Sequence, residues 1–127
     1  MTYYHSRTLD LPFPLAVDRT IAALKARGFG VLTRIDVQST LKEKIGADFR
    51  PYVILGACNP KMAFEALKAE DKIGTMLPCN VIVQETGAKV EVAAVDPVAS
   101  MQAIQNSALA KIATQVGDEL RAAIEAI

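Results

Sequence analysis

The chain has 127 residues, 14 Lys and Arg against 14 Asp and Glu, and 51% hydrophobic residues. This length predicts a single domain over residues 1–127, and the apolar content excludes an intrinsically disordered chain. Because the charges cancel, we expect no nucleic-acid partner, since phosphate contacts need grouped Lys and Arg. No apolar run reaches the roughly 18 residues of a membrane span, so we expect no membrane partner.

The N-terminal segment and the cysteines predict the compartment. Residues 1–7 lack the basic-then-apolar order of a secretory signal, which makes the cytoplasm the expected location. Two thiols, Cys58 and Cys79, do not make a disulfide framework, and in the cytoplasm both should be reduced.

The first third of the chain predicts a strand, a helix and a second strand. Residues 3–9 alternate in side-chain character, which is typical of an edge strand. Val17, Ile21 and Leu24 recur at helical spacing, so we expect an amphipathic helix that ends at Gly28. Residues 29–37 then predict a strand whose apolar face carries every second side chain: Phe29, Val31, Thr33, Ile35 and Val37.

The middle of the chain predicts a short helix and a central strand. Residues 38–46 favour a surface helix with Ser39 as its N-cap and Gly46 at its end. Residues 52–57 are apolar at every position, which indicates a strand covered on both faces.

A second helix and a hairpin follow. Asn59 and Pro60 predict a helix start, because asparagine is a favoured N-cap and proline fits the first helical turn. Apolar residues at helical spacing continue that helix to about residue 70. Residues 80–85 and 89–95 then predict two antiparallel strands that are joined by a tight turn at Thr86 and Gly87.

The C-terminal part predicts two helices. Asp96 and Pro97 repeat the cap-and-proline pattern and open a short helix to about Gln105. The last helix starts at Asn106, and its apolar residues show the strongest helical period in the chain: Leu109, Ile112, Val116, Leu120, Ile124 and Ile127.

These elements predict an α+β fold, an antiparallel sheet of about five strands with the long helices on one face. The first and last helices should cover that face. The other face would hold Leu32, Leu55 and Ile82, which also need a cover, since such a patch is unusually large for a monomer. Either the helix that starts at Pro60 or a second subunit would supply it.

The candidate site lies where two predicted strands place a cysteine beside an asparagine, at Cys58–Asn59 and at Cys79–Asn80. Cys58 comes just before a helix start, where the helix dipole lowers a thiol pKa and favours the thiolate. If the two strands are antiparallel neighbours, both thiols lie at the same end of the sheet, whereas disulfide distance does not follow. Two alternatives remain. Either both cysteines are structural and carry no chemistry, or at least one of them is a functional thiol.

No catalytic motif is present. The single histidine, His5, excludes a histidine relay, and His5, Cys58 and Cys79 fit no zinc spacing. The chain also lacks a phosphate loop and a Gly-x-Ser-x-Gly nucleophile elbow. We therefore expect no metal and no cofactor, and we favour a non-enzymatic role while leaving catalysis open.

Three segments carry a family resemblance: Gly28-Phe29-Gly30-Val31, Leu55-Gly56-Ala57-Cys58-Asn59-Pro60 and Leu77-Pro78-Cys79-Asn80-Val81. With the Asp96-Pro97 helix start, they make the chain resemble the bacterial and archaeal domain-of-unknown-function family 302 over nearly its whole length. The resemblance implies a TATA-binding-protein-like order of strand, helix, four antiparallel strands and helix, with two short inserted helices. It also implies a homodimer. The family has no established reaction, so no catalytic residue is carried over, although an association of some members with sulfur metabolism fits a thiol or persulfide carrier.

Three hypotheses about function follow. The first is a non-enzymatic cytoplasmic homodimer that binds a small ligand near Cys58, Asn59, Cys79 and Asn80, where free backbone N–H groups, amides and sulfurs meet. The second is a redox or sulfur-transfer protein that uses Cys58 or Cys79 as its nucleophile. The third is a structural or regulatory dimer without a small ligand.

Overall fold

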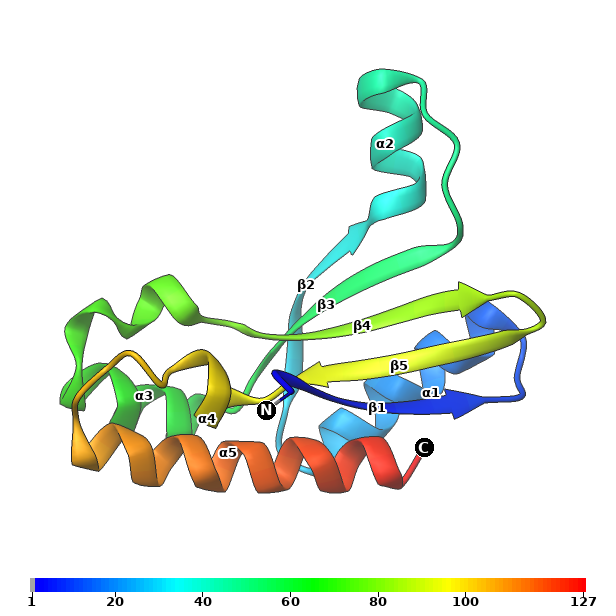
Figure 1. Ribbon diagram of the computed structural model, residues 1–127. Coiled ribbons are helices and arrows are strands. Elements are labelled where there is room, and N and C mark those ends of the chain that lie inside the picture. The colour runs from blue at the N-terminus through cyan, green and yellow to red at the C-terminus, as the bar shows by residue number, and fades with distance from the viewer. Residues whose placement is uncertain (1) are drawn as a thin grey trace.

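A five-stranded antiparallel sheet forms the centre of the computed structural model, which describes residues 2–127 (Figure 1). Met1 lies outside the described residues. The strands lie in the spatial order β1-β5-β4-β3-β2, and every neighbouring pair is antiparallel. This confirms the predicted α+β class. The strand bounds are β1 Tyr4–Leu9, β2 Gly30–Asp36, β3 Tyr52–Cys58, β4 Cys79–Thr86 and β5 Lys89–Val95.

Helical segments separate the first four strands and follow β5, and they gather mainly on one side of the sheet (Figure 1). The two long helices, α1 and α5, contact each other and cover one face, as the sequence predicts. Gly28 follows α1 with a φ of 87°, a left-handed conformation that glycine adopts without strain. The helical segments are α1 Phe13–Ala26, α2 Val37–Ile45, α3 Pro60–Ala69, the 3₁₀ helix η1 Asp71–Met76, α4 Pro97–Ser100 and α5 Ser107–Glu125.

The main hydrophobic core lies between the sheet and the helices α1 and α5. The predicted helix residues Val17, Leu24, Leu120 and Ile124 are all buried there. Leu55 also belongs to this core, where it is fully buried and pairs with Val81 of β4. The prediction that it lies on the opposite face is therefore wrong, because a strand with no polar residue gives no sign of which face each side chain takes. The remaining sheet residues of the core include Val53, Val81, Val83, Val90 and Val92.

A register shift in β2 changes the face of its second half. Val31 pairs with Ala57 and Thr33 with Gly56, so Leu32 is the extra residue of a bulge. Past the bulge, Ile35 lies opposite Ile54 and is 48% exposed. The prediction that Ile35 shares a core face with Val31 is wrong, because one inserted residue reverses the alternation of side chains.

The second face of the sheet is left open by the helices of the described chain. Its central row, read from the register, crosses the five strands through Ile35, Ile54, Ile82, Ala93 and Ser6. The helix α3 does not cover this row, since α3 contacts α5 and η1 instead. The central strand is thus not covered on both faces as predicted. From here on, "the open face" means this row with the flanking residues Tyr4 and Tyr52.

Three local predictions need correction. The N-cap of α2 is Asp36, whose Oδ1 accepts a hydrogen bond of 3.0 Å from the Ser39 backbone N–H, so the helix starts before the predicted cap at Ser39. The helix after Asp96 ends at Ser100, because the chain turns there to reach α5 instead of continuing to Gln105. The 3₁₀ helix η1 was not predicted, since a glycine in its middle indicates a break in the chain.

Candidate functional site

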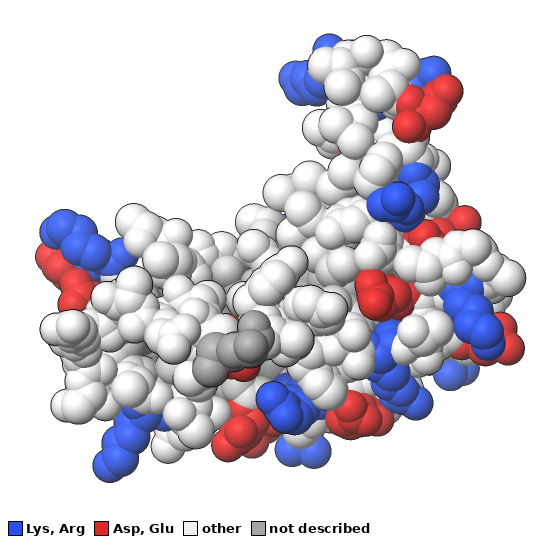
Figure 2. Space-filling model, viewed as in Figure 1, with Lys and Arg blue, Asp and Glu red and all other residues white. Residues whose placement is uncertain are grey.

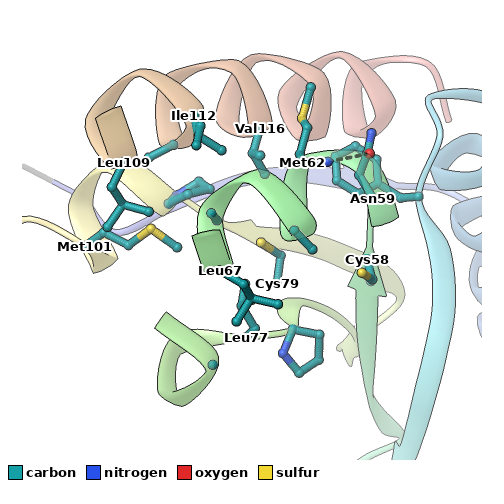
Figure 3. Close-up of a pocket in the computed structure, with 18 of the residues that line it drawn as sticks. Cys58, Asn59, Met62, Leu67, Leu77, Cys79, Met101, Leu109, Ile112 and Val116 are labelled. Atoms are coloured by element: carbon teal, nitrogen blue, oxygen red, sulfur yellow. Dashed lines mark hydrogen bonds between the residues drawn. The ribbon is translucent and has the colours of Figure 1, made fainter. Parts of the chain in front are cut away.

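A cavity of about 360 Å³ opens where β3 ends and β4 begins (Figure 3). It lies between the main core and a second, separate cluster of buried side chains formed by Ala66, Ile73 and Leu109. Ile112, which the helical period of α5 assigns to the sheet-facing stripe, packs against this second cluster. The cavity is therefore the gap between two hydrophobic clusters of one chain.

Apolar side chains form nearly the whole wall of the cavity. No Lys, Arg, Asp, Glu or His lies among the described residues that line it, and Asn59 is the one amide there. One wall comes from α3 and the opposite wall from α5 (Figure 3). These two helices contribute Met62, Ala63, Ala66, Leu67, Leu109, Ile112, Ala113 and Val116.

Asn59 fixes the direction of the α3 wall. Its Oδ1 accepts a hydrogen bond of 3.2 Å from the Met62 backbone N–H, which caps the first turn of α3. On its other side the Asn59 amide nitrogen lies 3.2 Å from where a Cβ at Gly28 would stand, so the cap packs against the end of α1. The predicted cap is confirmed, and the amide acts on the cavity by holding α3 in place.

The two cysteines lie at the same end of the sheet, as the antiparallel pairing predicts. Cys79 pairs with Ala57, the residue before Cys58, and both thiols are free. Cys58 is half-buried at the cavity, whereas Cys79 is 7% exposed. Burial, with a smaller contribution from nearby Cys58, raises the pKa of Cys79 to about 11. Cys79 is therefore a neutral thiol at physiological pH.

The fourth predicted residue, Asn80, is separated from the other three. It follows Cys79 along β4, so its side chain takes the opposite side of the sheet, where it pairs with Gly56 and borders a shallow hollow between Tyr4 and Tyr52. Cys58, Asn59 and Cys79 line the cavity, and Asn80 does not.

Comparison with known proteins identifies the family. The model of the family described as "Domain of unknown function DUF302" matches residues 5–127. The chain belongs to the DUF302 family. A similar solved structure is the crystal structure of an uncharacterized conserved DUF302 protein from Bacillus stearothermophilus, with 28% identity, 98% of each chain covered and a TM-score of 0.92. No curated protein matches the chain.

The described part of the DUF302 chain carries neither a metal-ligand cluster nor a helix that could span a membrane. Within residues 2–127, no cluster of three or more His, Cys, Asp or Glu could hold a metal ion. No helix in the same range combines the length and the apolar character needed to cross a membrane.

The α5 wall of the DUF302 cavity was not predicted as part of a site. The 19 residues of α5 extend over about 28 Å at 1.5 Å per residue, so its first turns run past the end of the sheet. Residues there, such as Leu109 and Ile112, need other partners and find them in α3 and η1. The helical period shows that these residues are buried, but it does not show what they face.

The two thiols of this DUF302 protein should differ in reactivity. At pH 8, Cys79 in the Cys58→Ser variant should react with iodoacetamide about tenfold or more slowly than Cys58 in the Cys79→Ser variant, because thiolate and exposure are both scarce at Cys79. The rate at Cys79 should rise as the pH approaches 11. Mass spectrometry of quenched samples measures both rates, and the urea-unfolded variants serve as the control. Equal rates in the folded variants would contradict the burial of Cys79.

Proposed function

We propose that this DUF302 protein is a cytoplasmic, non-enzymatic homodimer that binds a small, neutral, apolar molecule in the cavity between α3 and α5. The observation that carries the proposal is the apolar lining of a cavity of about 360 Å³ with no charged side chain on its wall. Known small-molecule sites range from about 300 to 1,000 Å³ and are mostly apolar. The size and the chemistry of this cavity both fit that class.

The lining selects against charged ligands. A carboxylate, phosphate or ammonium group that entered the cavity would lose its hydration shell without gaining an opposite charge. An apolar molecule would instead gain contacts with both hydrophobic clusters, from Val116 on one side to Leu109 on the other. The side chains that line the cavity have no contact partners on that side within the described chain, and a bound apolar molecule would supply those contacts.

The state of the thiols supports binding over thiol chemistry. A buried Cys79 with a pKa of about 11 behaves as a small apolar side chain and not as a nucleophile. The redox or sulfur-transfer alternative then rests on Cys58, which is half-buried at the cavity. If both thiols react only above about pH 8.5, as ordinary cysteine does, the thiol alternative fails.

The cytoplasmic location and the dimer have separate support. The two cysteines are free, which fits a reducing compartment. The open face leaves Ile35 exposed and Ile54 and Ile82 partly exposed, and a second subunit would remove these side chains from water.

A neutral fluorescent probe tests the ligand proposal. N-phenyl-1-naphthylamine should bind the wild-type protein saturably with increased fluorescence, and Ala63→Phe should weaken that binding about tenfold or more by filling the cavity. Ala22→Phe, at an exposed position of α1, is the matched control and should bind as the wild type does. Absence of saturable binding to the wild type would contradict the proposal and favour a dimer without a small ligand. Equal binding by Ala63→Phe would place the probe elsewhere.

A further inference from the structure

The helix α2 projects from the sheet on the side of the open face (Figure 1). This arm consists of α2 and the return segment 46–51, joined to the ends of β2 and β3. No residue of α2 is buried, and Ile45 at its tip is 72% exposed. The arm and the open face together make an L-shaped surface, and the notch between arm and body is largely uncharged in the space-filling view (Figure 2). The notch leaves room for a second molecule.

A second apolar surface lies at the other edge of the sheet. The arm joins the sheet at β2, and β1 is the opposite edge strand. Beside β1, Tyr3 is 70% exposed and Tyr4 43% exposed, with their rings edge to face. An edge strand with an unpaired side is a site that proteins normally cover or protect. The sheet thus carries exposed apolar groups at both of its edges, with the partly exposed Ile54 and Ile82 of the open face between them.

We infer that two copies interlock through these surfaces, with the open faces opposed and the arm of each copy packed against the β1 edge of the other. A two-fold axis that lies between the open faces and runs obliquely to the strands brings the arm of one copy over the Tyr4 end of its partner's β1, because the arm leaves β2 level with Arg7 and Tyr4 lies at the other end of β1. Ile45 of each arm then meets Tyr3 and Tyr4 of the partner, and the row through Ile54 and Ile82 of one sheet crosses the same row of the other. This inference rests on the homodimer proposed above and names its interface.

The available area matches what a stable dimer needs. Five strands about 4.8 Å apart and about 20 Å long offer roughly 500 Å². The arm helix, about 13 Å long and 10 Å wide, adds roughly 130 Å², and the β1 edge that receives the partner's arm adds a similar area. The sum is close to the ~800 Å² per partner of a standard interface, about a tenth of the 7501 Å² surface of one copy.

The charged groups that border the open face can be covered because they already have hydrogen-bond partners. Gln84 Nε2 donates a hydrogen bond of 2.9 Å to Glu91 Oε1, and Arg50 Nη1 donates one of 3.5 Å to Gln84 Oε1. These two hydrogen bonds link the Arg50 cation through Gln84 to the Glu91 carboxylate. Covering them with a second copy therefore leaves no isolated charge in the interface.

Light scattering at micromolar concentration tests the interlock. The wild type and the control Leu15→Glu, at an exposed position of α1 in the helical layer, should have the mass of a dimer. Ile45→Glu on the arm and Ile82→Glu on the open face should each raise the dissociation constant by about 100-fold or more. A monomeric wild type would overturn both the homodimer and the interlock. A dimer that survives Ile45→Glu would overturn the interlock alone.

Cross-linking gives a second test that tolerates a poorly folding variant. In a background with Cys58→Ser and Cys79→Ser, an Ile45→Cys chain is mixed with a separate Tyr4→Cys chain and treated with a short bismaleimide. The mixture should give a cross-linked heterodimer, because Ile45 of one copy lies beside Tyr4 of the other. Cross-links between two Ile45→Cys chains, without any between an Ile45→Cys chain and a Tyr4→Cys chain, would indicate arm-to-arm contact and overturn the interlock.

Discussion

Leu120→Ala should lower the free energy of unfolding by about 2–5 kcal/mol, the usual cost of truncating a buried leucine. Leu120 lies on α5 against the main core and is only 1% exposed. The substitution removes apolar contacts and leaves a cavity between helix and sheet that the surrounding side chains fill only in part. Urea unfolding followed by circular dichroism measures the change.

Leu15→Ala supplies the comparison for that measurement. Leu15 lies on α1 and is 38% exposed, so its truncation should cost well under half as much as that of Leu120. A loss below about 1 kcal/mol at Leu120 would mean that the α5 stripe does not pack on the sheet.

Gly56→Ala should cost about 1–3 kcal/mol, because a methyl group at this position has no space. A Cβ at Gly56 would stand 2.7 Å from Cγ of Pro78 and would overlap Oγ1 of Thr33. Thr33 can turn its hydroxyl away, whereas the proline ring is rigid, so strands β3 and β4 must shift at the cavity end. Thermal and urea unfolding both report this loss.

Gly30→Ala is the matched control for Gly56→Ala. Gly30 also lies in a strand, but a Cβ there would have no neighbour within 4 Å. Its substitution should change stability by no more than about 0.5 kcal/mol. Equal effects of the two substitutions would indicate a general response to alanine in the sheet and not a clash with Pro78.

The sequence predicted the parts of the fold that depend on local chemistry. Asn59, Asp96 and Asn106 each accept a backbone hydrogen bond at the start of a helix, as their sequence positions indicate. The side-chain alternation after Leu32 could not be predicted, because a bulge depends on how two strands pair. The same is true of α3, whose contact with α5 is decided by tertiary packing.

The candidate site was predicted in part for a related reason. Cys58, Asn59 and Cys79 come together because adjacent antiparallel strands end and begin at the same edge, which the sequence order implies. Asn80 was grouped with them because it is adjacent in sequence, yet neighbours in a strand point to opposite faces. The apolar nature of the cavity depends on α5, which is distant in the sequence.

The division of the buried side chains into two clusters has a consequence for motion. The smaller cluster around Ile73 holds α3 and η1 to the start of α5, with the Asn106 amide donating a hydrogen bond of 2.8 Å to the Ala69 carbonyl. Because this cluster has far fewer buried residues than the main core, α3 and η1 should open at a lower free-energy cost than the sheet. Hydrogen exchange should therefore be faster in residues 60–76 than in β3 to β5. Such local opening gives a molecule a path into the cavity while the sheet stays folded.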